Sequence, residues 1–439
     1  MFINTHYSPS NFYDGAWRAT ELTLNADLSR DVDLGLTKPV TVAFGGEYRK
    51  NVYAIGAGDL GSYTLGGAQA YPGFAPIDAG SHNRHNVALY ADVTAHLTEA
   101  WLIEPAVRWE HYSDFGNAAT FKVTSRYDLS PAFGVRGTVS TGFRAPTLLE
   151  EYYSATNVSP TAATIQLPSN SAGAKSLGFQ NLRPEKSTNY SIGLVLRPVP
   201  RLTVTIDAYQ VSVRNRILAT STLYAAGGGT NYPQVAAAII ANGDVIDPSL
   251  TTTGVSLYTN AADTRTRGVD VVASYPTDLG VIGKVNWTLA GTFNQTTATR
   301  LYTTSTIIAL ADTFSPTAKS SLEGFTPKLK LISGAQLTHG KLDANLRGTF
   351  YTRTTTTVTP GGGLYYPQSV PPAYIVDLDF AYQASKALRL SAGANNLLNK
   401  QPPLVNTAQT GGSILNARIT TSPYGINGGY YYGKVAVTF

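Results

Sequence analysis

Hydrophobic and polar side chains alternate along many short segments of this chain, most clearly at 374–382. One face of that segment carries Tyr374, Val376, Leu378, Phe380 and Tyr382, and the other carries Ile375, Asp377, Asp379 and Ala381. Eight steps of about 3.3 Å, tilted by about 40°, cover roughly 20 Å. The pattern predicts a β-strand across an apolar layer, with aromatic residues at both borders. A strand of a water-soluble sandwich shows the same alternation but rarely both aromatic ends.

The same division between two faces appears in other segments. Apolar residues oppose polar or charged ones in each: Trp101, Ile103, Val107 and Trp109 oppose Glu104, Arg108 and Glu110; Val285, Trp287, Leu289 and Phe293 oppose Asn286, Thr288 and Asn294; Leu342, Ala344, Leu346 and Phe350 oppose Asp343, Asn345 and Arg347. Charged side chains are costly in the dry core of a sandwich, but they are acceptable in a water-filled lumen.

About 15 strands are predicted in this way. They lie near 16–28, 39–50, 85–97, 100–112, 119–128, 133–143, 186–197, 201–213, 265–275, 283–295, 327–338, 341–352, 373–382, 387–395 and 429–439. Short connections alternate with long ones rich in Gly, Thr, Ser, Tyr and Pro. Short turns on one rim and long loops on the other are typical of outer-membrane barrels. We therefore expect an all-β, transmembrane antiparallel β-barrel.

An odd number of strands does not close an all-antiparallel barrel, because the first and last strands then run in the same direction. Bacterial single-chain barrels have even numbers of strands. Either one strand escapes the pattern, or the barrel is incomplete and open. The first residues, MFINTHYSPSN, also lack the basic start and apolar core of a signal peptide.

Composition narrows the class of protein further. The chain has 439 residues, 43% of them hydrophobic, without the run of about 20 apolar residues that a membrane helix needs. It has no cysteine, which excludes a disulfide scaffold or a thiolate metal site. Its net charge of +5 is small for the length and spread along the chain, so no nucleic-acid partner is expected.

Specific segments carry a resemblance to a known family. TGFRAPTLLEEYY (141–153) and NLRPEKSTNYSIGL (181–194) resemble the place where a barrel strand of TonB-dependent outer-membrane receptors opens into a long outer loop and returns. The terminal segment 429–439 resembles the family's closing strand with its final aromatic residue. The signature residues are Gly142, Phe143, Arg144, Ala145, Pro146, Asn181, Pro184, Glu185 and Phe439. The simpler interpretation of the GFRAP residues is architectural, with Pro146 ending the strand ladder and Arg144 anchoring the loop.

The resemblance implies active uptake of a bulky, scarce solute, such as a ferric siderophore, haem, cobalamin or an oligosaccharide. The family's barrels have about 22 strands around a plug, on which an inner-membrane TonB complex pulls. Residues 1–439 then form the C-terminal portion of such a barrel, with the plug and about seven strands absent. DNA upstream is expected to encode them, and the chain alone is not expected to transport, because two unpaired strand edges would face lipid.

Partners and ligand contacts follow from the same resemblance. The expected partners are outer-membrane lipid, a small-molecule ligand such as an iron chelate, and the TonB complex acting through the missing plug. Candidate ligand contacts are the aromatic residues of the long connections: Tyr63, Tyr71, Phe74, Tyr224, Tyr232, Tyr258, Tyr365, Tyr366 and Tyr424. For any one of them, packing within a loop is the simpler role. His82 and His85 are three residues apart, but a solvated loop pair is the simpler interpretation.

No catalytic motif, cofactor motif or metal site stands out in the sequence, so an enzyme is not expected. Two other functions compete with the receptor. A complete 16-stranded diffusion porin would suit the length. However, a porin needs an even number of strands, and the GFRAP and NLRPEKS segments argue against it. A soluble β-propeller lectin predicts a repeat of about 40–50 residues, whereas the strand spacings here are unequal.

Overall fold

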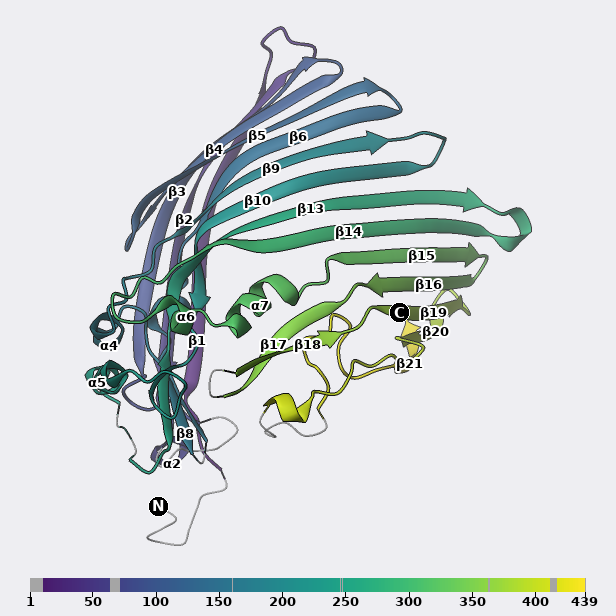
Figure 1. The fold of residues 1–439 in the computed structure, drawn as a ribbon. Coiled ribbons are helices and arrows are strands. Elements are labelled where there is room, and N and C mark those ends of the chain that lie inside the picture. Colours follow the sequence, from purple (N-terminus) through teal and green to yellow (C-terminus); the bar gives the residue numbers. More distant parts are fainter. Residues whose placement is uncertain are drawn as a thin grey trace.

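The computed structural model describes residues 11–63, 72–159, 161–244, 246, 248–361, 364–410 and 417–438. Within them, fifteen strands form one curved antiparallel sheet, here called the wall (Figure 1). In spatial order its strands are β1 (Ala16–Val32), β2 (Val40–Gly56), β3 (Gly80–Thr98), β4 (Trp101–Tyr112), β5 (Gly116–Ser130), β6 (Phe133–Arg144), β9 (Glu185–Leu196), β10 (Thr203–Ala219), β13 (Tyr258–Asp278), β14 (Lys284–Leu301), β15 (Leu329–His339), β16 (Leu342–Tyr351), β19 (Ala373–Gln383), β20 (Leu388–Asn395) and β21 (Tyr430–Val437). Every predicted strand corresponds to one of these, which confirms the expected barrel-type fold.

The two faces of the wall differ as the alternation predicts. Outward-facing apolar side chains are exposed, among them Leu289, Leu346 and Phe380. Charged side chains of the opposite face form ion pairs across strands. Arg347 of β16 lies directly opposite Asp377 of β19, with 2.7 Å between Arg347 Nη2 and Asp377 Oδ2. The wall therefore has an apolar side suited to hydrocarbon and a charged side suited to enclosed water.

Glycines on the inner face give room to long side chains of neighbouring strands. Gly193 of β9 lies between Arg136 of β6 and Asp207 of β10 in one row of the sheet. Because Gly193 has no side chain, the Arg136 guanidinium reaches across it, with Nη2 2.6 Å from Asp207 Oδ2. Opposite Gly268 of β13, the Tyr209 ring of β10 covers the glycine in the same way. Inner-face glycines thus determine where cross-strand contacts form.

Replacing Gly268 with alanine is expected to destabilise the wall by about 1–3 kcal/mol through overpacking. A Cβ atom there would lie 2.7 Å from the Phe293 carbonyl oxygen and against the Tyr209 ring. Thermal unfolding of the detergent-solubilised protein, followed by circular dichroism, measures the change. Gly433→Ala is the matched control, because a Cβ atom at that position meets nothing within 4 Å. Equal effects of the two substitutions would contradict the packing account.

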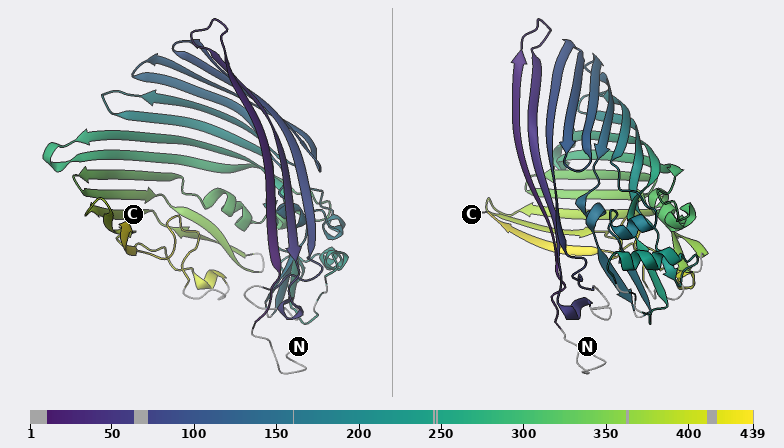
Figure 2. Two further views of the ribbon diagram at one scale, coloured as in Figure 1. Left: turned by 180° about the vertical axis from the view of Figure 1, so that it is seen from behind. Right: turned by 90° about the vertical axis from the view of Figure 1, so that its left-hand side faces the viewer.

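The wall is open, because its end strands β1 and β21 do not pair with each other in the described part of the chain (Figures 1 and 2). Fifteen antiparallel strands place these two end strands in the same direction. Each end therefore presents one row of backbone N–H and C=O groups without a neighbouring strand of the sheet. Such edges are unstable in hydrocarbon, where water does not satisfy them.

The other elements gather mainly at one end of the long strands, in the connections predicted to be long (Figure 2). A second sheet, ordered β11-β12-β8-β7, contains β7 (Ala155–Ser159), β8 (Ala162–Gln166), β11 (Leu223–Ala226) and β12 (Thr252–Ser256), and β17 (Thr354–Gly361) pairs with β18 (Leu364–Val370). The helices are α2 (Leu60–Tyr63), α3 (Leu148–Tyr152), α4 (Ala172–Ser176), α5 (Pro233–Ala241), α6 (Leu310–Thr313), α7 (Pro316–Gly324) and the 3-10 turns η2 (Gly280–Ile282) and η3 (Thr407–Thr410). Among the described residues, no helix is long and apolar enough to cross a membrane.

Candidate functional site

The GFRAP segment lies at the loop end of the wall. Residues 142–144 are the last of β6, and Arg144 joins three elements there. Its Nη1 lies 2.9 Å from Glu150 Oε2 in α3, and its Nη2 lies 2.9 Å from Glu185 Oε1 at the start of β9. Thr147 caps α3 by accepting from the Glu150 backbone N–H at 3.1 Å. Arg144 therefore fixes the exit and the return of this loop.

The other signature residues lie around the same junction. Gly142 leaves room for the Ser187 side chain of β9, since a Cβ atom at position 142 would lie 2.8 Å from Ser187 Oγ. The Pro146 carbonyl accepts a hydrogen bond from the buried guanidinium of Arg84. Ala145 leads into this turn, Asn181 is exposed, and Pro184 directly precedes β9. Phe439 lies outside the described residues.

A buried charge cluster holds the turn in place. Arg84 of β3 is only 5% exposed. Its Nε lies 2.5 Å from Asp114 Oδ2, and its Nη2 lies 2.8 Å from Glu151 Oε2. One guanidinium thus serves two carboxylates. Burial raises the pKa of the Glu151 carboxyl to about 7; the charge of Arg84 opposes this, and repulsion from Asp114 adds to it.

Stability of this junction is expected to depend on pH through Glu151. When the pH is below 4.5, the ordinary pKa of this group, the carboxyl is neutral in both folded and unfolded protein. The contribution of the neutral carboxyl to the free energy of unfolding is then fully present. This contribution is lost as pH rises through the folded pKa of about 7. The melting temperature of wild-type protein should therefore match that of Glu151→Gln at low pH and fall below it above neutral pH. A wild type that is the more stable of the two above neutral pH would show that the ion pair with Arg84 dominates.

Beneath the junction lies a cavity of about 590 Å³, here called the rim pocket. Trp17, Tyr112 and Phe143 line it together with Arg49, Arg84 and Arg144. Each of these arginines is already engaged by a carboxylate: Arg49 with Glu47, Arg84 with Asp114 and Glu151, and Arg144 with Glu150 and Glu185. The rim pocket is lined by aliphatic, aromatic and charged side chains, and its cations are neutralised by carboxylates of the protein itself.

The connections β6–β9 and β10–β13 fold together into a small unit, here called the loop module. It consists of β7, β8, β11, β12, α4 and α5, and β8 pairs with β12 in parallel. Its buried core includes Ile165, Leu177, Val235, Ile239 and Leu257. Ser305 Oγ donates to the Leu177 carbonyl at 2.6 Å, which attaches the β14–β15 connection to the module. The outer loops therefore have their own hydrophobic core.

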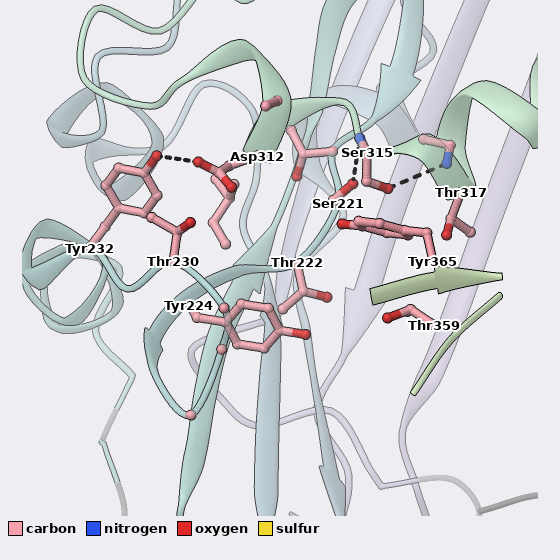
Figure 3. A pocket seen from close by; sticks show the side chains of 17 residues that line it. Ser221, Thr222, Tyr224, Thr230, Tyr232, Asp312, Ser315, Thr317, Thr359 and Tyr365 are labelled. Atoms are coloured by element: carbon pink, nitrogen blue, oxygen red, sulfur yellow. Dashed lines mark hydrogen bonds between the residues drawn. The ribbon is translucent and has the colours of Figure 1, made fainter. Parts of the chain in front are cut away.

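Beside the loop module lies a second cavity of about 660 Å³, here called the loop pocket (Figure 3). Three of the candidate aromatic residues, Tyr224, Tyr232 and Tyr365, line it. The Tyr232 hydroxyl donates to Asp312 Oδ2 at 2.6 Å. Burial raises the pKa of Tyr232, and this hydrogen bond raises it further. Asp312 and the Ser and Thr side chains of this pocket are residues that the sequence pattern does not single out. The structure thus brings three predicted contacts into one cavity.

The remaining candidates lie elsewhere. Phe74 is buried with Tyr53 and Leu148 in a separate core, and Tyr424 lies 6.2 Å from Tyr351, centroid to centroid. Tyr63 ends α2, Tyr258 begins β13, and Tyr366 follows Tyr365 in β18 without lining the loop pocket. Tyr71 lies outside the described residues. For Phe74, packing is the role that the contacts support.

No metal centre is evident in the part of the chain that the structure describes, where no group of three or more His, Asp or Glu side chains converges. His82 instead stacks on Tyr152, with 3.7 Å between ring centroids and 9° between planes. This contact packs the start of β3 against α3.

Comparisons with known proteins agree with this architecture. A family model described as TonB dependent receptor-like, beta-barrel matches residues 2–397. The vitamin B12 transporter BtuB of Vibrio cholerae is 28% identical over 100 residues, which are 23% of this chain and 15% of that protein. Two crystal structures share the fold: the siderophore receptor PirA from Acinetobacter baumannii (TM-score 0.64, 16% identity, 96% of this chain and 55% of that one) and a mutant of the ferric enterobactin receptor PfeA from Pseudomonas aeruginosa (TM-score 0.65, 17% identity, 96% and 54%). The chain spans about half the length of these solved receptors.

Proposed function

The chain belongs to the TonB-dependent receptor β-barrel family, whose members are outer-membrane transport receptors of Gram-negative bacteria, and we propose that it forms barrel wall and outer loops of such a receptor. The observation that carries this proposal is the match of the family model to the wall from β1 through β20. The apolar outer face and the ion-paired inner face support it, because a wall of this kind separates lipid from an enclosed aqueous space.

The open wall supports a further part of the proposal. We propose that residues 1–439 are the C-terminal portion of the receptor barrel, and that additional strands complete the cylinder next to β1 and β21. Both edges of the sheet then gain neighbours, which removes their unpaired backbone groups from lipid. A plug inside the completed barrel would link the receptor to the TonB complex and to its source of energy.

The proposed solutes are bulky and scarce: a ferric siderophore, haem or cobalamin. Proteins similar to this chain include siderophore receptors, a ferric enterobactin receptor and a vitamin B12 transporter. Outer loops with their own core, such as the loop module, suit first recognition of a large solute outside the cell. The inner ion pairs leave the lumen polar enough for a hydrated path.

Uptake measurements test this function. A strain that expresses the complete receptor, with the additional strands and plug proposed above, should accumulate at least one of ferric enterobactin, haemin and cyanocobalamin, and a strain that lacks it should not. This accumulation should stop when TonB is deleted or when an uncoupler collapses the proton-motive force. Passive entry of small sugars with a sharp size limit in liposome swelling, unaffected by the uncoupler, would instead favour a diffusion porin.

A further inference from the structure

Three outer connections that are far apart in sequence build the loop pocket. The β10–β13 connection supplies Tyr224 and Tyr232, the β14–β15 connection supplies Asp312 and Ser315, and the β17–β18 hairpin supplies Tyr365. Hydrogen bonds join these connections: the Ser315 N–H donates to Ser221 Oγ at 3.1 Å, and the Ala309 N–H donates to Tyr232 Oη at 3.3 Å. The Thr357 N–H of β17 donates to Ser320 Oγ of α7 at 2.8 Å, which attaches the hairpin. The pocket is therefore assembled by the fold rather than by a single flexible loop.

Hydroxyl groups dominate its lining. Ten of the seventeen lining residues are Ser, Thr or Tyr, and Figure 3 shows several of them around one hollow. The lining thus offers both donors and acceptors to a ligand that carries many polar groups of its own.

The charge of the pocket is negative. Asp312 is the one charged side chain among the described lining residues. Its Oδ2 accepts from Tyr232, and a carboxylate retains further acceptor capacity for hydroxyl donors. An anionic ligand would meet this carboxylate without a compensating cation, and such like-charge contact disfavours binding. A ferric tris-catecholate is such an anion, because its dianionic catecholates outweigh the charge of Fe³⁺.

Aromatic rings complete the arrangement. Tyr224 and Tyr365 both border the hollow, and Tyr365 is 39% exposed. Gly227, with φ of 75°, permits the turn that carries the loop back over the Tyr224 ring, where Gly228 approaches closely. Exposed rings beside hydroxyls and a carboxylate suit the C–H faces and hydroxyl edges of sugar rings.

We propose that the loop pocket is a binding subsite for an uncharged, polyhydroxylated ligand of the saccharide class, and that it rejects anionic iron chelates. This inference rests on the receptor function proposed above and specifies the part of the solute that the outer loops hold. Tyr365 acts as the stacking platform, and Asp312 accepts ligand hydroxyl groups. The loop pocket then holds an uncharged sugar or similar hydroxyl-rich part of the transported solute, and an iron chelate without such a part does not occupy it.

Binding to the whole protein, extracted from outer membranes in detergent, tests the inference. Neutral oligomers of glucose, galactose, mannose and N-acetylglucosamine serve as probes in saturation-transfer NMR and calorimetry. At least one should bind, and Tyr365→Ala and Asp312→Asn should each raise its Kd by about tenfold, a typical cost of losing one strong contact. Tyr366→Ala is the matched control and should leave Kd unchanged, because its neighbouring ring does not line the pocket.

The possible outcomes separate this inference from the receptor function. Absence of binding by every neutral oligomer, or equal loss in Tyr365→Ala and Tyr366→Ala, would overturn the subsite. Ferric enterobactin binding that Tyr365→Ala weakens would also overturn it, while leaving the receptor function intact. If the receptor function itself is wrong, uptake should instead continue unchanged after TonB is deleted or the proton-motive force is collapsed.

Discussion

Replacing Arg84 with methionine is expected to destabilise the protein by about 3–5 kcal/mol, the usual cost of breaking a buried ion pair. The substitution leaves the Asp114 and Glu151 carboxylates without their cation and the Pro146 carbonyl without its donor. The damage should concentrate at the loop end of the wall, where α3 begins. Thermal unfolding in detergent gives the size of the effect, and hydrogen exchange of residues 146–152 gives its place.

Two further variants make this prediction specific. Arg126→Met removes a paired arginine whose side chain is 39% exposed, and it should cost less than about 1 kcal/mol. Above neutral pH, where Glu151 is ionised, adding Glu151→Gln to Arg84→Met should restore part of the loss, because a neutral amide then replaces a carboxylate that has lost its cation. Similar costs for Arg84→Met and Arg126→Met, or no recovery in the double variant, would contradict the structural role of the buried cluster.

Truncating Ile239 to alanine is expected to cost the loop module about 2–5 kcal/mol. Ile239 of α5 is completely buried in the core of the module. A cavity there should loosen α4, α5 and β12 and distort the loop pocket, whereas the wall strands keep their own hydrogen bonds. Hydrogen-exchange mass spectrometry should therefore show faster exchange in 162–179, 233–244 and 248–257 and unchanged protection in β4 and β14.

The neighbouring residue on the same helix provides the control. Ile240 is 64% exposed, so Ile240→Ala should change exchange little, within about 0.5 kcal/mol. If Ile239→Ala accelerated exchange equally in the wall and in the loops, the loop module would not be an independent packing unit. If both alanine variants behaved like wild type, its core would not hold the loops together.

The wall strands were predictable from sequence because hydrocarbon imposes a strict period of two. In β19, the apolar Leu378 and Phe380 alternate with Asp377 and Asp379, so one segment defines both its faces. The extensions of β10 to Ala219 and of β13 back to Tyr258 were not predicted. There the strands continue beyond the alternating segments, and both faces carry mixed residues, so the alternation fades although the hydrogen-bonded ladder continues.

The loop module was missed for a different reason. Its core joins Ile165, Leu223 and Val235, which come from segments without a period of their own. Local signals do exist: Pro233 begins α5 of the module before an alanine-rich run, and outside the module Ser315 followed by Pro316 begins α7. Such signals predict short helices, but they do not predict which distant segments pack together.

The candidate ligand contacts also depend on long-range packing that the sequence does not reveal. Residue type alone did not separate Tyr224 and Tyr365, which border a cavity, from Phe74, which is buried in a core. Aromatic residues suit both roles, and only the long-range packing distinguishes them. The hydroxyl groups and Asp312 of the loop pocket carry no signal in the sequence, because single Ser, Thr and Asp residues are common in loops. Their convergence is visible only in three dimensions.

Single-cysteine labelling of β19 in outer membranes tests the central claim most directly, and residues 1–439 contain no cysteine of their own that would also react. Cysteines at Asp377 and Asp379 should react with a charged, water-soluble maleimide, and cysteines at Leu378 and Phe380 should react only with a reagent that partitions into lipid. The account predicts this alternation along the whole strand. Equal reactivity at all four positions, or protection of both faces from water, would contradict a wall between hydrocarbon and an aqueous lumen.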